Sequence, residues 1–371
     1  MGTSADTLQI RSRILKEIKD LQGARLLKKR VLFDNDDQLA DIERTEDDPS
    51  AHLFLEDFDL KTERIRKSSP WGQHPSWRLL SVIVKCRDDL RQEQLACQII
   101  SEFRRAWVVA GLPLFVHPFR VLVTSRTSGL VETIPNATSI HSIKKYAYTT
   151  KLAYGGTEYT LKDHFAKEFG PVDSPRYRAA QSRFANSLAG YSLVCYFLNL
   201  KDRFVFKFIL LHKRTFKIYF IIYFRHDGNI LLDREGRLIH IDYGFMLSNS
   251  PGSVKFETAP FKMTQEYIDV LGGVDSDAFD AFQVMLQQGF RALRERVDSM
   301  ALLLEIMHHS SSMPCFIAGG DYVVTAFRER FRLDLRDDEL DVFVDGILTD
   351  ACTNLSTQLY DQYQYYTNGI L

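Results

Sequence analysis

Polar side chains at the open end of a predicted β-hairpin are the residues of this chain best suited to chemistry. Two runs of apolar, β-branched residues flank the turn at 233–236 (Asp-Arg-Glu-Gly), which is the pattern of two antiparallel strands. A hairpin brings its two ends together, so the amide oxygen of Asn229 and the carboxylate of Asp242 are expected to converge. Two oxygen ligands with His226 and Asp227 nearby suit a magnesium ion that carries nucleotide phosphates.

The order of these residues is the order found in kinases. The hairpin ends in Asp242-Tyr243-Gly244, and kinases hold their metal ions with an Asn followed by an Asp-x-Gly sequence. The same residues also fit an ordinary hairpin whose polar ends are solvated. On this segment alone both interpretations stay open, so other segments have to distinguish them.

A lysine and a glutamate form a second candidate group. Residues 81–85 (SVIVK) alternate as a strand that ends in Lys85, and a helix is expected over about 88–110. Glu93 lies in that helix, eight positions after the lysine, and can form an ion pair that aims the ammonium at a phosphate. Taken alone, Lys85 is better explained as a surface lysine at the end of a strand.

The segment before this strand predicts a turn between two strand-like segments. The turn holds Ser68, Ser69, Pro70, Gly72 and Pro75, and as a whole it offers hydroxyl and backbone N–H groups to a phosphate. The turn lacks the Gly-x-Gly-x-x-Gly pattern of protein kinases. An ordinary protein kinase is therefore a poor match.

The composition limits the class of protein. The chain has 371 residues, a formal net charge of -1 and 45% hydrophobic residues, which is ample for one bilobal domain or two smaller ones. The near-neutral charge argues against nucleic-acid binding by bulk electrostatics. Five scattered cysteines without CxxC spacing fit reduced thiols in a cytosolic protein, and the N-terminus has no apolar signal core.

The remaining segments supply the elements that must position these groups. Apolar residues at helical spacing predict helices, and short alternating runs predict strands. The expected segments are an amphipathic helix over 1–33, an acidic linker over 34–50, a strand pair at 119–125 and 129–137, a long apolar helix over 176–200, and helical stretches over 265–307 and 334–366.

Several segments share one order that is highly specific. They are Lys85 with DDLRQE, then GYSLVCYFLNLKDR, HDGNILLD, HIDYGF, FETAPFKMTQEYIDVLGG and LYDQYQYYTNGIL. Together they resemble the phosphatidylinositol 3-/4-kinase superfamily, and within it the type III beta phosphatidylinositol 4-kinases. The resemblance implies an α+β, bilobal protein-kinase-like (lipid kinase) fold. An antiparallel-sheet N-lobe is expected at 60–136 and a mainly helical C-lobe at 137–371, after an N-terminal helix and linker at 1–59.

The resemblance implies which residues hold ATP. A phosphate loop at 68–77 would replace the Gly-rich loop, and the lysine with its carboxylate partner would contact the phosphates. The backbone of two hinge residues would meet adenine. The implied nucleotide-binding residues are Ser68, Ser69, Lys85, Glu93, Glu132 and Ile134.

The resemblance also implies the catalytic and metal residues. The superfamily's catalytic loop reads Asp-Arg-His-x-x-Asn, so His226 would act near the inositol hydroxyl as a base or charge stabiliser. Asp202 would support the loop, and Lys85 would neutralise phosphate charge. Asn229 and Asp242 would bind Mg2+.

One stretch departs from the family pattern. Asp202 and Arg203 should run directly into His226, but residues 204–224 intervene, and Arg225 stands on the far side. These 21 residues are dominated by Phe, Ile, Tyr, Leu and Lys, with no Gly, Ala, Pro, Asp or Glu. The favoured types are mostly specified by A/T-rich codons. The stretch separates two groups that must lie close together.

Three interpretations of this stretch compete. A transmembrane span is disfavoured because basic residues interrupt its centre, namely Lys207, His212, Lys213, Arg214 and Lys217. A hairpin of two aromatic arms could instead touch an anionic lipid face. We favour an intron translated in frame. If residues 203–224 are present in the protein, we expect a strong loss of activity and an aggregation-prone segment.

The segment after the metal motif bears on the substrate. Residues 242–263 contain only two basic side chains, Lys255 and Lys262. A headgroup that already carries phosphates would need several Lys or Arg residues. Two lysines suit the single phosphodiester of phosphatidylinositol, although solvated loop lysines explain them equally well.

The expected function is ATP- and Mg2+-dependent phosphorylation of phosphatidylinositol at the inositol 4-hydroxyl. The alternative is an inactive kinase-fold protein, nucleotide-binding or scaffolding, because the stretch splits the catalytic loop. A protein kinase of the related large-kinase group is disfavoured by the ending TNGIL and the short activation segment. The expected partner is phosphatidylinositol in membranes and not nucleic acid. Cytoplasmic, peripheral attachment to Golgi membranes is suggested by the resemblance, and the docking region for small GTPases or adaptors is largely missing.

Overall fold

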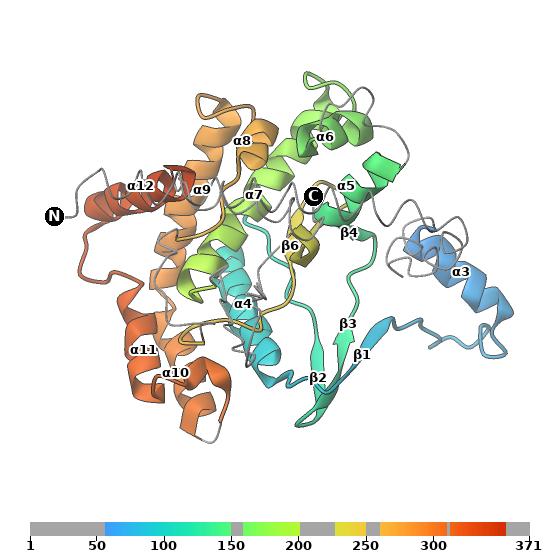
Figure 1. Ribbon diagram of the computed structural model, residues 1–371, viewed down its shortest axis with the longest axis horizontal. Coiled ribbons are helices and arrows are strands. Elements are labelled where there is room, and N and C mark those ends of the chain that lie inside the picture. The colour runs from blue at the N-terminus through green and yellow to red at the C-terminus, as the bar shows by residue number, and fades with distance from the viewer. Residues whose placement is uncertain (1–55, 150–158, 201–226, 250–259, 310–311, 354–371) are drawn as a thin grey trace, which may run out of the picture. The chain divides into compact units, whose positions relative to one another are not determined.

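The computed structural model describes residues 56–149, 159–200, 227–249, 260–309 and 312–353 (Figure 1). The chain divides into two units, Met1–Leu55 and Glu56–Leu371, and every described residue belongs to the second. The helix expected over 1–33 and the acidic linker expected over 34–50 lie outside the described residues.

The described elements are mainly helical, with six short strands. The strands are β1 (Val82–Cys86), β2 (Val121–Ser125), β3 (Ser128–Glu132), β4 (Ala137–Ser139), β5 (Ile230–Asp233) and β6 (Leu238–His240). The helices are α3 (Phe58–Ser68), α4 (Arg91–Val109), α5 (Ile140–Thr149), α6 (Leu161–Phe169), α7 (Pro175–Phe197), α8 (Gln265–Leu271), α9 (Asp277–Arg294), α10 (Val297–His309), α11 (Gly320–Glu329) and α12 (Asp337–Thr353), with short 3-10 helices η2 (Asp227–Asn229) and η3 (Pro314–Phe316).

The segment before the turn at 69–77 is helix α3, and our expectation of a strand-like segment there was wrong. The carboxylate of Asp57 accepts hydrogen bonds from the N–H groups of Asp59 and Leu60, at 2.8 and 3.4 Å. An aspartate in this position satisfies N–H groups that have no partner within the helix. The N-cap signals this helix more clearly than the apolar pattern does.

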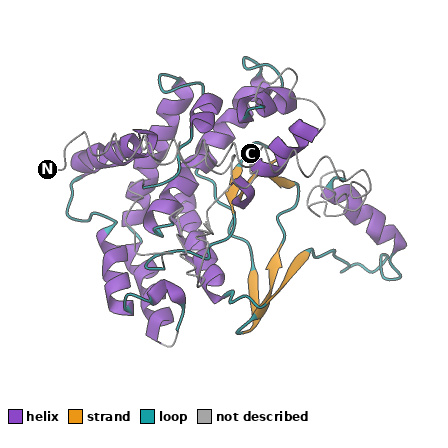
Figure 2. Ribbon diagram, in the orientation of Figure 1, coloured by secondary structure: helices purple, strands orange, loops and turns teal. Residues whose placement is uncertain are grey.

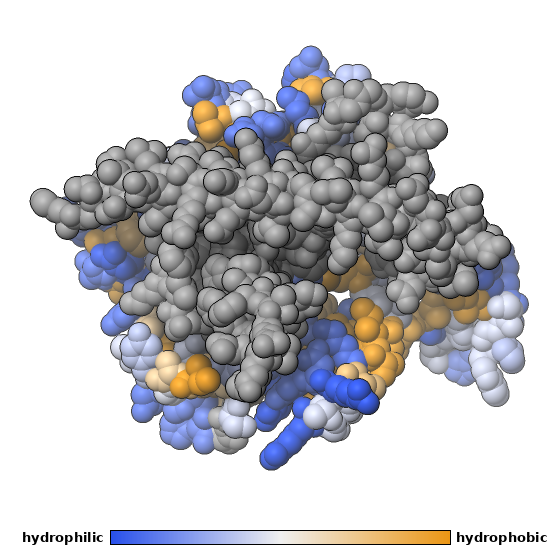
Figure 3. Space-filling model, in the orientation of Figure 1, coloured by the Kyte–Doolittle hydropathy of each residue, from blue (hydrophilic) through white to orange (hydrophobic). Residues whose placement is uncertain are grey.

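Strands β1, β3 and β2 form an antiparallel three-stranded sheet in that order. Helix α4 packs on it through contacts with β2. The expected strand pair is confirmed in β2 and β3, but the chain leaves this sheet after Glu132, before the predicted end at residue 137. Figure 3 shows an apolar area over this sheet, where Val82, Ile83, Val84 and Leu122 are exposed.

The predicted hairpin is confirmed, and it belongs to a second three-stranded sheet, β4-β5-β6. In its turn the carboxylate of Asp233 accepts hydrogen bonds from the N–H groups of Glu235 and Arg237, each 2.8 Å long. Gly236 has a φ of 86°, which glycine adopts without steric cost. Strand β4 was not expected, because three residues are too few to show an alternating pattern.

Helix α7 lies at the centre of the helical part and packs against α9, α6 and β6 (Figure 1). The Ser174 side chain caps its first turn by accepting the N–H of Tyr177 at 3.2 Å, and Pro175 occupies the first helical position. Phe197, near its end, is fully buried against the ring of Phe290, with 4.8 Å between ring centroids. A helix covered on several sides is apolar around most of its circumference, which explains the sequence pattern at 176–200.

Figure 2 shows the strands confined to two groups, while helices make up most of the remaining described chain. The expected α+β class with antiparallel strands is therefore confirmed. None of the described helices combines the length and apolarity needed to cross a bilayer.

Two partly buried histidines predict acid sensitivity. Burial lowers the pKa of His117, partly offset by Glu132 and Asp233 and reinforced by Arg104. Burial likewise lowers the pKa of His164, with Glu168 opposing and Lys167 reinforcing. A depressed pKa in the folded state gives stability that is present above the ordinary pKa and is lost as the pH falls through the folded pKa.

We therefore expect the free energy of unfolding to fall as the pH is lowered from about 7.5 to 5. Chemical denaturation across this range, with His117→Gln and His164→Gln combined, should show a shallower decline than the unmodified chain. His74→Gln in the exposed turn is the control and should leave the decline unchanged. An identical decline in the double variant would contradict the prediction.

Candidate active site

Lys85 and Glu93 form the ion pair that the sequence suggested. Lys85 lies near the end of β1, opposite Gly129 of β3, and Glu93 lies in the first turn of α4. The Lys85 Nζ atom is 3.5 Å from Glu93 Oε2 and 3.6 Å from Asp88 Oδ2. The glutamate side chain is buried while a third of the lysine side chain is exposed, so the lysine is the more accessible member of the pair.

The charges around this pair hold the lysine in its charged form. Burial favours the neutral amine, but the carboxylates of Glu93, Asp242 and Asp88 outweigh it and raise the pKa of Lys85. Burial raises the pKa of Glu93, with Lys85 opposing and the negative charge of Asp242 adding to the rise. Asp242 therefore acts on both members of the pair, although it lies about 150 positions away in sequence.

Asn229 and Asp242 lie at the same end of the β5–β6 hairpin. The N–H of Ile241 donates to the carbonyl oxygen of Asn229 at 3.0 Å, which extends the pairing beyond the strands. Asp242 has a φ of 65°, in the left-handed region, and its Oδ1 accepts the N–H of Gly244 at 3.1 Å. Such a backbone conformation is uncommon outside glycine and recurs at functional sites.

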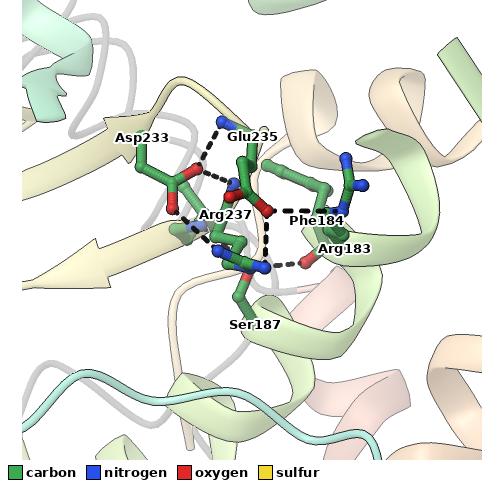
Figure 4. Close-up of polar contacts among 7 residues, drawn as sticks. Arg183, Phe184, Ser187, Asp233, Glu235 and Arg237 are labelled. Carbon is green, nitrogen blue, oxygen red and sulfur yellow. Dashed lines mark hydrogen bonds and ion pairs between the residues drawn. The ribbon is translucent and has the colours of Figure 1, made fainter. Parts of the chain in front are cut away.

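The closed end of the hairpin is anchored on helix α7 (Figure 4). The Ser187 hydroxyl accepts the N–H of Leu238 at 2.9 Å and donates to the carbonyl of Phe184 at 2.9 Å. Next to it, Glu235 lies 2.6 Å from the guanidinium of Arg237 and 3.6 Å from that of Arg183. These contacts fix the hairpin against the central helix, so its open end is positioned by rigid elements.

Ser187→Ala is expected to destabilise the fold by about 1–2 kcal/mol, because it leaves the buried N–H of Leu238 without its acceptor. Ser192→Ala is the matched control on the same helix. The Ser192 hydroxyl is also buried but has no hydrogen-bond partner among the described residues, so its removal should cost less. Denaturant unfolding of both variants tests this, and equal losses would contradict it.

The segment behind Asp242 is held from two helices, which the sequence did not suggest. The Gln92 side chain of α4 donates to the carbonyl oxygens of Tyr243 and Gly244 at 2.9 and 2.6 Å. Asn199, just after α7, donates to the carbonyl of Leu247 at 2.8 Å. The only sequence signal for Gln92 is its position beside Glu93, inside DDLRQE.

The predicted phosphate-loop serines make local hydrogen bonds. Ser68 is the last residue of α3, and its hydroxyl donates to the carbonyl of Ile65 at 3.0 Å. The Ser69 hydroxyl accepts the N–H of Trp71 at 3.3 Å and the indole N–H of Trp77 at 3.2 Å. A role for these serines in phosphate binding stays a prediction.

The predicted hinge residues lie at the end of β3 and after it. The Glu132 carboxylate is held by the guanidinium of Arg120 at 2.8 Å, and that hydrogen bond lowers the pKa of the carboxyl group. The N–H of Glu132 donates to the carbonyl of Arg120 at 2.9 Å, inside the sheet. Ile134 is partly buried against the core.

The predicted substrate and catalytic-loop residues are mostly outside the described part of the chain. Asp202, His226 and Lys255 fall there. Lys262 is described and is half-buried, and it lines a small cavity together with His240 and Tyr267. Its role in substrate binding stays a prediction.

The family model for phosphatidylinositol 3- and 4-kinase matches residues 80–221 and 216–317 of the chain. The chain belongs to this kinase family. The matched residues include β1 with Lys85, the central helix α7 and the hairpin with Asp242. The kinase domain of the family is bilobal, so the predicted lipid-kinase fold is confirmed. The lobe boundaries at 60–136 and 137–371 stay predictions.

Named relatives show the same similarity. Phosphatidylinositol 4-kinase pik1 of Schizosaccharomyces pombe is 41% identical over 387 aligned positions, which cover 99% of this chain and 42% of the relative. Phosphatidylinositol 4-kinase beta of Homo sapiens is 40% identical over 328 positions, covering 88% of this chain and 36% of the relative. The protein of the same name from Sorex araneus is 40% identical over 328 positions, covering 88% and 37%. The chain thus spans well under half the length of the curated relatives it matches.

The donor chemistry at the open end of the hairpin fits a magnesium ion. An amide oxygen from Asn229 and a carboxylate from Asp242 are oxygen ligands of the kind that Mg2+ prefers. Among the described residues no cluster of three or more His, Cys, Asp or Glu side chains is arranged to hold a metal. Mg2+ commonly completes its coordination with nucleotide phosphates and water, so two protein ligands are compatible with such an ion.

Proposed function

We propose that the chain transfers the γ-phosphoryl group of ATP to the 4-hydroxyl of phosphatidylinositol. The observation that supports this best is the Lys85–Glu93 ion pair together with the nearby charge of Asp242, which helps to raise the pKa of Lys85. A lysine at the end of a strand, held by a glutamate of the next helix and facing a metal-binding aspartate, is the arrangement that phosphoryl transfer requires. The relatives that match most of the chain are named phosphatidylinositol 4-kinases.

In this proposal ATP is held by groups on both sides of the site. The charged Lys85 neutralises the phosphates, and the Ser68–Ser69 turn lies over them. The backbone N–H of Glu132 already donates to the carbonyl of Arg120, so in this proposal the backbone of Glu132 binds adenine through its carbonyl oxygen. The backbone of Ile134 then supplies the N–H donor.

Magnesium, held by Asn229 and Asp242, would neutralise charge on the β- and γ-phosphates. His226 would act at the inositol hydroxyl, either as the base that accepts its proton or as a group that stabilises the developing charge. Asp202 would support the catalytic loop. Because little covalent chemistry falls to the protein, the rate depends mainly on positioning and on neutralising charge.

The acceptor in this proposal is phosphatidylinositol in a membrane. Lys255 and Lys262 would neutralise its single phosphodiester, whereas a headgroup with further phosphates would need more positive charge. We further propose peripheral attachment to cytoplasmic membranes, with the Golgi suggested by the resemblance of the motifs. We also propose a small GTPase or an adaptor as a protein partner, on the basis of the resemblance of the motifs.

Radiolabelled phosphate transfer to liposomes tests the function. Vesicles of phosphatidylcholine with phosphatidylinositol, with phosphatidylinositol 4-phosphate, or with neither should show label only on phosphatidylinositol, and none on a peptide acceptor. A version lacking residues 203–224 is assayed in parallel, because the alternative of a catalytically inactive kinase-fold protein applies only to the full chain. Label on peptide, or none on lipid in either version, would remove the proposal.

A further inference from the structure

We propose that Gln92 is a positioning residue that couples the Lys85–Glu93 ion pair to the metal-binding Asp242. This inference rests on the proposed kinase function. It goes beyond that function because the side chain touches neither ATP nor metal in the proposed arrangement. It acts through the backbone of the two residues that follow Asp242.

The side-chain amide of Gln92 joins two segments that lie about 150 residues apart. It is 4% exposed, and its Nε2 donates to Tyr243 O at 2.9 Å and to Gly244 O at 2.6 Å. Gln92 immediately precedes Glu93, and Tyr243 immediately follows Asp242. A single amide therefore links the neighbours of both functional carboxylates.

The orientation of this amide follows from what surrounds it. Both of its acceptors are carbonyl oxygens, so only the NH2 group can face them. The Oε1 atom is buried without a hydrogen-bond partner among the described residues. A buried amide oxygen without a partner is costly, and the two hydrogen bonds from Nε2 offset that cost.

The backbone that Gln92 holds needs external support. Asp242 has a left-handed φ of 65°, a conformation that persists only where neighbouring groups hold it. Gly244 O also accepts the Asn249 side chain at 2.9 Å, so this carbonyl is bonded from α4 and from its own loop. Without Gln92, the support that remains for this carbonyl among the described residues is the Asn249 side chain of the same loop.

The consequence is that a movement of α4 acts on the ion pair and on the metal ligand together. If the helix withdraws, Glu93 leaves Lys85 and Nε2 leaves the loop that carries Asp242. Groups that orient a metal ligand without touching the metal commonly change metal affinity by about 10–100-fold. Gln92 should therefore affect ATP binding only where Mg2+ contributes to it.

The test compares Gln92→Met with Gln94→Met. Gln94 is a matched control, because it lies on the same helix and its Nε2 donates to a backbone carbonyl of β2, Val121 O, at 3.0 Å. ATP affinity of the full chain is measured by calorimetry with Mg2+ and with EDTA. Turnover and KM for ATP are measured in whichever version, full or lacking 203–224, transfers phosphate.

For Gln92→Met we expect the ATP dissociation constant to rise about tenfold in Mg2+ and to change less than about twofold in EDTA. Turnover should fall by about tenfold or more, and KM for ATP in Mg2+ should rise with the dissociation constant. Gln94→Met should resemble the unmodified chain in all three measurements. If Gln92→Met fails to fold, Gln92→Asn, whose shorter side chain retains the amide, is measured in its place with the same expectation.

Two results overturn different statements. Equal enhancement of ATP binding by Mg2+ in the Gln92 variant, the Gln94 variant and the unmodified chain would overturn the coupling and leave the kinase proposal intact. Absence of ATP binding by both the full chain and the version lacking 203–224, with and without Mg2+, would remove the proposed function and this inference with it.

Discussion

A chain that joins Asp202 to His226 through a single arginine is expected to phosphorylate phosphatidylinositol about a thousandfold faster than the full chain. The stretch 203–224 separates two residues that must act on the same substrate hydroxyl. General acid–base catalysis contributes about 10²–10⁴-fold when the group is correctly placed, and small displacements remove much of it. Initial rates on phosphatidylinositol vesicles, measured for both versions at equal protein concentration, test the expectation.

The described residues on either side of this stretch support the shorter connection. After α7, Leu198 O accepts the N–H of Leu247 at 2.7 Å. On the far side, Asn229 O accepts the N–H of Ile241 at 3.0 Å. Both ends are thus tied to the short segment 241–247. The two matches to the family model also meet at residues 216–221, inside the same stretch.

The transcript provides an independent test of the same hypothesis. If the stretch is a translated intron, the sequence of the messenger RNA should join the codons of Asp202 and His226 through one arginine codon.

The control for the rate assay on phosphatidylinositol vesicles is a version that lacks five residues of the acidic linker at 34–50. It should have the rate of the full chain. Equal activity with and without 203–224 would contradict the expectation and favour the membrane-touching hairpin.

Lys85→Met is expected to lower phosphoryl transfer by about 10²–10³-fold, measured in whichever version is active. The substitution keeps an unbranched side chain only one atom shorter and removes the charge proposed to contact the phosphates. It also leaves Glu93 buried beside Asp242 without its cation, so ATP affinity should fall with turnover. Initial rates and ATP dissociation constants give both effects.

Lys67→Met is the matched control for this substitution. Lys67 also pairs with a glutamate, Glu63, at 3.7 Å, but both side chains are exposed on α3. Exposed pairs of this kind contribute about 0–1 kcal/mol, so the control should retain full activity and nearly full stability. Loss of activity in both variants, or in neither, would count against a role for Lys85 at the phosphates.

Much of the site could be predicted because its elements carry local signals. The hairpin was predictable from the two apolar runs on either side of its turn. In that turn the Asp233 side chain accepts a backbone N–H group, and Gly236 adopts a positive φ. Helix α7 was predictable from a long apolar run that starts at Ser174 and Pro175. The Lys85–Glu93 pair followed from a strand end and a helix start only eight positions apart.

Other features could not be predicted, because they depend on neighbours that are distant in sequence. Helix α3 is a different case, because it was taken for a strand although its N-cap Asp57 is a local helix signal. Strand β4 is recognisable only beside β5, about 95 positions later. The hydrogen bonds of Gln92 and the pairing of Glu132 with Arg120 are visible only once the chain is packed.

The sequence by itself determined the family, the two antiparallel pairings and the types of side chain available to ATP and metal. These properties depend on the types of residues that lie a few positions apart in the sequence, because turns and periodic patterns are local. Only the tertiary structure placed the charge of Asp242 near Lys85 and Glu93, and only it revealed that the Gln92 side chain binds the backbone after Asp242. Such contacts join elements about 150 residues apart, and their geometry is set by how α4, the hairpin and α7 pack against one another.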